Sequence, residues 1–121
     1  MRQFENARDS ITRALLVIET TNERWFESEL NRRAGDVALL TPPPDEATAE
    51  AYFERALNIA RAQQAKSLEL RAAMSMARLW RDQGKPHQAR ELLAPVYGWF
   101  TEGFDTLDLR QAKALLDKLA Q

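Results

Sequence analysis

The sequence contains no cysteine and only one histidine, His87. Without cysteine the chain can form neither disulfides nor thiolate metal sites, and a lone histidine lacks a second ligand at metal-binding spacing. The absence of disulfides fits a cytoplasmic setting. The nucleotide-binding loop G-x-x-x-x-G-K-[ST] is also missing. We therefore expect a protein that is not an enzyme and has no catalytic residues, metal or cofactor.

Excess charge of either sign and long apolar runs are missing as well. The formal net charge is −1, so no overall field would draw the chain to nucleic acid or to an anionic membrane. No apolar run approaches the roughly 20 residues that cross a bilayer. The first ten residues, MRQFENARDS, lack the apolar core of a signal peptide. The sequence thus favours neither a nucleic-acid nor a membrane partner.

Residues that break helices are scarce, with four glycines and five prolines among 121 residues. Alanine, leucine, arginine, glutamate and glutamine dominate, and all are strong helix formers. No segment shows the alternation of a strand. The length suits one domain with a single core. We therefore predict one all-α domain over residues 1–121.

Apolar residues recur at helical spacing in six segments. The predicted helices span residues 5–20, 23–40, 45–64, 68–83, 86–100 and 108–120. Three prolines at 42–44 separate the second helix from the third, because proline lacks an N–H group and disfavours helix before it. Ser67 is the expected N-cap of the fourth helix, and Asp105 or Thr106 that of the last. Gly84 is the expected stop after the fourth helix.

Residues 70–101 resemble the tetratricopeptide repeat, in which small and large apolar residues alternate between two packed helices. Met76 and Ala77 take its leucine-glycine position, Trp80 its tyrosine, Gly84 its turn glycine, Ala89 its alanine and Leu93 its phenylalanine, whereas Val96 departs from the pattern. The preceding hairpin matches in its second helix at Ala49, Phe53, Ala56 and Leu57, and only Gly35 fits in its first. Phe53 and Leu93 are 40 residues apart, against a repeat of about 34. We expect the proline loop to hold the extra length.

Three longer stretches resemble the C-terminal tetratricopeptide region of large bacterial signalling ATPases: RWFESELNRRAGDVALL, AEAYFERALNIARAQQAKSLELRAAMSMARLW and ARELLAPVYGWFTEGFDTLDLRQAKALLDKL. In that family a cyclase or DNA-binding domain and a nucleotide-binding module precede the repeats. The resemblance covers residues 23–119. It implies a short right-handed solenoid of hairpins at 23–64 and 67–100, with a capping helix at 106–120. Residues 1–20 would then be the second helix of a truncated upstream repeat, and the chain a fragment or a small stand-alone relative.

The resemblance also implies a protein-interaction or regulatory role, because the first helix of each tetratricopeptide hairpin lines a concave groove. Arg71, Arg78 and Arg81 share one helix face. The residues at groove positions are Arg71, Met74, Arg78, Arg81 and Asp82, continued on the previous hairpin by Arg32, Arg33 and Asp36. One interpretation is an arginine-lined groove for an acidic peptide or a carboxylate terminus. The other is an ordinary solvated face with internal ion pairs.

Four aromatic residues follow Pro95 and surround Gly98 and Gly103. We expect Trp99, Phe100 and Phe104 to fasten the final helix to the last hairpin, with Gly103 at a positive φ. The alternative is a ligand or partner site built on Tyr97, Trp99 and Phe104. A second functional hypothesis is homodimerisation, because a truncated solenoid exposes an apolar end that tends to pair.

Overall fold

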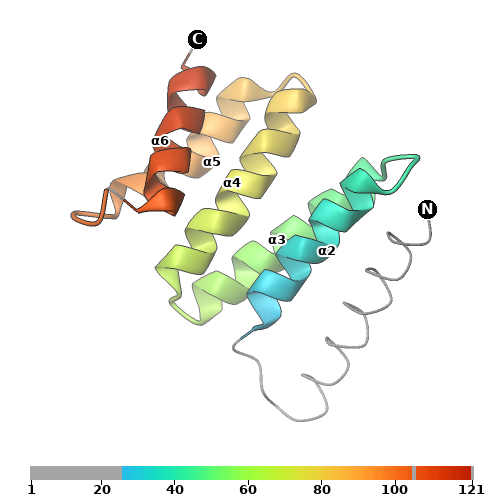
Figure 1. The fold of residues 1–121 in the computed structure, drawn as a ribbon, viewed down its shortest axis with the longest axis horizontal. Coiled ribbons are helices and arrows are strands. Elements are labelled where there is room, and N and C mark those ends of the chain that lie inside the picture. Colours follow the sequence, from blue (N-terminus) through green and yellow to red (C-terminus); the bar gives the residue numbers. More distant parts are fainter. Residues whose placement is uncertain (1–25, 105, 121) are drawn as a thin grey trace.

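A computed structural model of the chain describes residues 26–104 and 106–120 (Figure 1). These residues form helices and no strand, which confirms the all-α prediction for this part of the chain. The helices are α2 (Glu27–Leu40), α3 (Glu46–Ala62), α4 (Lys66–Asp82), α5 (Pro86–Gly98) and α6 (Leu107–Leu119). The helix predicted at 5–20 lies outside the described residues.

Successive helices run in opposite directions and form two layers (Figure 1). Helices α2, α4 and α6 lie in the nearer layer of the view, and α3 and α5 lie behind them. Helix α4 packs closely against each of the other four described helices, whereas the backbones of α3 and α5 do not approach each other closely. The fold is therefore organised around α4.

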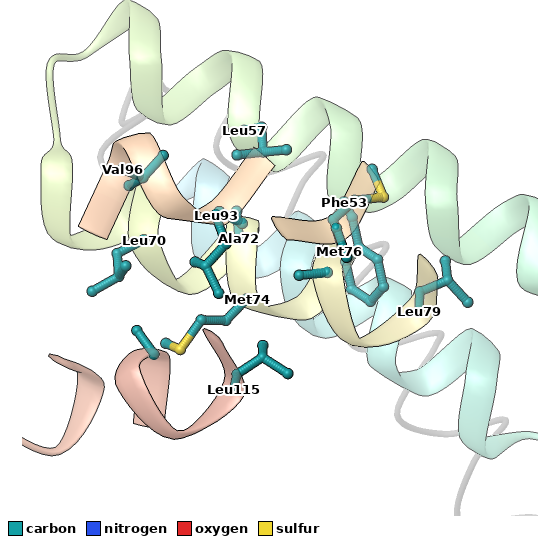
Figure 2. Packing of buried hydrophobic residues seen from close by; sticks show 14 of the residues in the cluster. Phe53, Leu57, Leu70, Ala72, Met74, Met76, Leu79, Leu93, Val96 and Leu115 are labelled. Atoms are coloured by element: carbon teal, nitrogen blue, oxygen red, sulfur yellow. The ribbon is translucent and has the colours of Figure 1, made fainter. Parts of the chain in front are cut away.

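The central position of α4 determines which residues form the core. The sequence predicts one apolar face on α4 with Leu70, Ala73 and Met76, and these residues are buried. The structure also buries Ala72, Met74, Ser75 and Leu79, because neighbours cover α4 on more than one side. Phe53 and Leu57 of α3 and Leu93 and Val96 of α5 fill the space between the helices (Figure 2). Alanines at the crossings allow this close approach.

Two connections share one geometry. At the α3–α4 turn, Gln64 has a φ of 55° and the Ala65 N–H donates to the Ala60 carbonyl. At the α4–α5 turn, Gly84 has a φ of 79° and the Lys85 N–H donates to the Trp80 carbonyl. This is the helix stop expected at Gly84.

The predicted N-cap of α4 is wrong. Ser67 lies inside the first turn, because the reversal at Gln64 lets the helix begin at Lys66 with Ala65 at the cap position. Thr106 does precede α6, but its side chain makes no capping hydrogen bond. Asp105 lies outside the described residues. Helix α5 passes through Pro95 and ends at Gly98, and Gly103 has the expected positive φ of 77°.

The prediction for the proline loop is also wrong. The loop precedes Phe53, so it cannot lengthen the interval from Phe53 to Leu93. That interval is filled by the rest of α3 and all of α4, each 17 residues long, against 13 residues in α5. The loop instead provides the cap of α3, where Asp45 accepts hydrogen bonds from the backbone N–H and the hydroxyl of Thr48 at 3.0 and 2.6 Å.

Gly35 is the closest approach of α2 to α3. A Cβ atom added there would lie 2.7 Å from Cδ1 of Phe53, which is fully buried. We expect Gly35→Ala to lower the free energy of unfolding by about 1–3 kcal/mol, because overpacking outweighs the gain in helix propensity. Urea titration measures this change. Gly98→Ala is the control, since a Cβ there meets nothing within 4 Å; equal stability of the two variants would contradict the close-packing account.

Candidate functional site

The layer formed by α2, α4 and α6 carries a chain of charged side chains. Arg71 of α4 lies at its centre. Its Nε donates to Oδ2 of Asp108 on α6 at 2.8 Å, and its Nη1 donates to Oε2 of Glu29 on α2 at 3.5 Å. Arg71 therefore joins the three helices of this layer through one guanidinium group.

The chain of charges continues along α2. Arg32 donates to both carboxylate oxygens of Glu29, at 3.0 and 3.1 Å, and to Oδ2 of Asp36 at 3.3 Å. Glu29 is thus shared between two arginines. These contacts fit the interpretation of a face with internal ion pairs for Arg32 and Arg71.

The surroundings shift the pKa values of these groups in different directions. Burial alone raises the pKa of Glu29, but the hydrogen bond from Arg32 and the charges of Arg32, Arg71 and Arg33 outweigh burial and leave it lowered. Burial raises the pKa of Asp36, and the charges of Arg32 and Arg78 only partly oppose it. The hydrogen bond to Asp108 raises the pKa of Arg71. The network therefore favours the charged form of Glu29, whereas burial disfavours the charged form of Asp36.

Other arginines of the same layer are free of such pairing. Arg78 is partly buried and Arg33 is exposed, and neither forms a hydrogen bond or salt bridge with residues 26–104 or 106–120. Arg81 bonds only its chain neighbour Asp82, at 3.2 Å. The structure thus divides the predicted residues into a paired group and a group with available charge. We call the surface formed by Glu29, Arg32, Arg33, Asp36, Arg71, Arg78, Arg81, Asp82 and Asp108 the arginine face.

One predicted member does not belong to the arginine face. Met74 is only 3% exposed and packs toward α6 beside Leu115 (Figure 2). It was expected at the surface because it falls on a groove position of the tetratricopeptide pattern, but α6 covers that side of α4. Met74 is a core residue and cannot contact a partner.

The aromatic residues do not form one site. The Tyr97 and Phe104 rings lie 5.8 Å apart and line a shallow cavity of about 320 Å³ beside α6. The Trp99 ring instead meets Phe100 edge-on at 5.2 Å, and Lys66 at the start of α4 lies 5.5 Å from a Trp99 ring centroid. Trp99 is 57% exposed and lines a different cavity of about 570 Å³ with Arg61 and Phe100. Tyr97 and Phe100 are the members that pack against the core.

The described residues hold no cluster of metal ligands and no helix that could span a membrane. Within residues 26–104 and 106–120, no group of three or more histidine, aspartate or glutamate side chains could hold a metal ion. His87 is exposed and its Nε2 lies 2.8 Å from Glu91 on the same helix. No helix in this part of the chain is long and apolar enough to cross a bilayer.

Glu29 and Asp108 belong to this ion-pair network, but the sequence analysis did not identify them as site residues. Each is a carboxylate in the first turn of its helix, where the helix dipole favours an acid. The pairs within α2 could be found from the spacings 29–32 and 32–36. The contacts of Arg71 could not, because they join residues 42 and 37 positions apart.

Comparisons with known proteins give no match: no protein-family model, no curated protein and no solved structure is similar to the chain. Function must therefore be argued from the arginine face and from the arrangement of the helices.

The opposite pKa shifts of two carboxylates give a test of the network. A lowered pKa means that Glu29 contributes stability above its unfolded-state pKa, and this contribution disappears as the pH falls through the folded-state value. We expect Glu29→Gln to lower the free energy of unfolding at pH 7 by about 1 kcal/mol and to reduce the loss of stability below about pH 4.3. Chemical denaturation at a series of pH values measures both effects.

Asp36→Asn is the matched control. Because the Asp36 pKa is raised, its contribution is present below the unfolded-state pKa and is lost as the pH rises through the folded-state value. Asparagine also keeps an acceptor for Arg32. The variant should therefore be at least as stable as the wild type at pH 7, and equal losses in both variants would contradict the assigned shifts.

Proposed function

We propose that this chain is a non-catalytic, cytoplasmic protein-interaction module that binds an acidic segment of a partner protein on its arginine face. The observation that carries the proposal is the presence of Arg33 and Arg78 on one surface without an ion-pair partner among the described residues. Arginine forks suit carboxylates, and a charged surface of this kind speeds and orients association.

The arrangement of the helices supports the tetratricopeptide part of the proposal. In such a repeat protein each hairpin contacts only its neighbours. Here α2 pairs with α3 and α4 pairs with α5, α3 contacts α4, and α2, α4 and α6 contact one another in that order. We infer a short right-handed solenoid in which these three helices line the binding side and α6 caps the last hairpin.

The regulatory part of the proposal rests on the resemblance of residues 23–119 to the C-terminal repeats of bacterial signalling ATPases. Any nucleotide or cyclase chemistry of such a protein would belong to its other domains. The role left for this chain is recognition, since surfaces built on rigid stacked helices are well suited to hold a partner segment.

A peptide-display library selected on the immobilised chain tests the function. We expect the enriched peptides to be rich in aspartate and glutamate. Their affinity should fall at least about tenfold in Arg78→Glu/Arg81→Glu, because two attractive charges become repulsive. Arg55→Glu/Arg90→Glu is the matched control, since both residues are exposed on the rear helices α3 and α5. Selected peptides that bind the two variants equally well would refute the proposal.

Self-association is a second candidate function, favoured by large apolar side chains around the α5–α6 connection. Trp99 is 57% exposed, Phe104 45% and Leu107 65%. All three lie at the α5–α6 connection, and large exposed apolar side chains favour an interaction surface there. Two copies could cover this end by a two-fold contact, as most homodimers do.

Sedimentation and light scattering over a wide range of concentrations test self-association. A dimer through this end should dissociate in Trp99→Ser/Leu107→Ser, because the variant removes apolar area from the contact. Leu40→Ser, with an equally exposed leucine at the end of α2, should leave the dimer intact. A wild-type monomer at every concentration would exclude this function.

A further inference from the structure

Two arginines of α4 occupy related positions but have different surroundings. Arg71 and Arg78 are seven residues apart, which places them two turns apart on the same face. Arg71 has a carboxylate on either side, Glu29 from α2 and Asp108 from α6. Arg78 forms no ion pair with any described residue. The surface around Arg78 therefore lacks the carboxylate partners that Arg71 has.

On the side of α2 the pattern repeats. Asp36 follows Glu29 by seven residues, as Arg78 follows Arg71. Asp36 is close enough to Arg78 for that charge to lower its pKa, although burial raises the pKa more strongly. Its recorded hydrogen bond goes to Arg32 rather than to Arg78. A carboxylate thus stands beside Arg78 without bonding it.

On the side of α6, no acid follows Asp108 by seven residues as Asp36 follows Glu29 on α2. Beyond Asp108, the inward-facing residues of α6 are apolar, with Leu115 and Leu119 both buried. Asp117 is the next acid of α6, and it is exposed and bound to Lys113 at 3.3 Å. No described carboxylate of α6 therefore takes the place on Arg78 that Asp108 takes on Arg71.

We propose that Arg78 is the residue that binds a carboxylate side chain of the acidic partner segment, in the position equivalent to that of Asp108 on Arg71. This inference rests on the proposed function and names its central contact. Arg33 of α2 and Arg81 of α4 add positive charge to the arginine face, whereas Arg71 is occupied by the chain's own carboxylates. An arginine that is partly buried and unpaired gains most from a charge-assisted bidentate bond.

The surrounding charges favour an acidic peptide over a nucleic acid. Asp36 and Asp82 lie on the same face as Arg78, so the positive field around it is weak and local. A row of phosphates needs an extended array of cations, and its binding would be opposed by these two carboxylates. A single carboxylate side chain requires only one arginine fork.

Fluorescence anisotropy with a labelled oligoglutamate peptide tests the inference, with an oligoglutamine peptide of equal length as the neutral probe. Arg78→Gln should weaken oligoglutamate binding about tenfold, the loss expected for one charge-assisted contact. Arg90→Gln removes an equal charge from the exposed surface of α5 and should leave binding unchanged. Oligoglutamine should not bind either the wild type or the variants.

Two further variants test the comparison between the arginines. Arg71→Gln should weaken oligoglutamate binding less than Arg78→Gln does, because Arg71 is already paired, whereas an equal or larger loss would overturn the inference. Asp108→Asn should raise the affinity, because it frees Arg71 to bind a second carboxylate. Unchanged affinity in Asp108→Asn would overturn the equivalence of the two positions.

The inference and the proposed function fail in different ways. If oligoglutamate does not bind, or if Arg78→Gln and Arg90→Gln bind it alike, the assignment to Arg78 is wrong. The proposed function then still stands provided that display-selected peptides lose affinity in Arg78→Glu/Arg81→Glu. If those peptides bind Arg78→Glu/Arg81→Glu as tightly as the wild type, the arginine face itself is not the binding surface.

Discussion

The packing of α4 against all four other described helices is the constraint on which the structure depends. A helix surrounded in this way needs small residues where neighbours cross closely and larger ones where they diverge. Ala72, Ala73 and Ala77 are fully buried and meet the first need, and Leu70 and Met76 meet the second. Arg71, Arg78 and Arg81 lie on a strip of α4 that this packing leaves partly exposed. The arginine face is thus a consequence of how the core is built.

The same packing determines which arginines are available. Helix α6 ends the nearer layer and brings Asp108 to Arg71 through the contact of its first turn with α4. Further along, α6 contributes leucines to the core, and its next carboxylate, Asp117, pairs with Lys113 of the same helix. One end of the arginine face is therefore closed by internal ion pairs, and the other end keeps unpaired charge. The arginines without an ion-pair partner among the described residues are Arg78 and Arg33, which are the sites proposed for a partner's carboxylates.

Polar contacts join the two hairpins in addition to the apolar core. The Trp80 indole N–H of α4 donates to Glu50 of α3 at 2.7 Å. Within the first hairpin, the Ser28 hydroxyl of α2 donates to the Ala56 carbonyl of α3 at 2.9 Å. Glu69, which is almost fully buried, is held by Arg61 and Lys66 at 3.2 Å each. These bonds satisfy groups that would be costly to bury alone. They fix how the hairpins sit against each other and so keep the arginine face in one shape.

The sequence by itself determined the helical class, most helix limits within a few residues, and the stop at Gly84, because periodicity and breakers are local properties. It also placed Arg71, Arg78 and Arg81 on one face, since helical spacing suffices for that. Only the tertiary structure decided that Met74 is buried, that Trp99 lies apart from Tyr97 and Phe104, and that Arg71 is paired while Arg78 is not. These outcomes depend on where α6 and α2 lie against α4. Spacing along one helix cannot reveal what a distant segment brings to its surface.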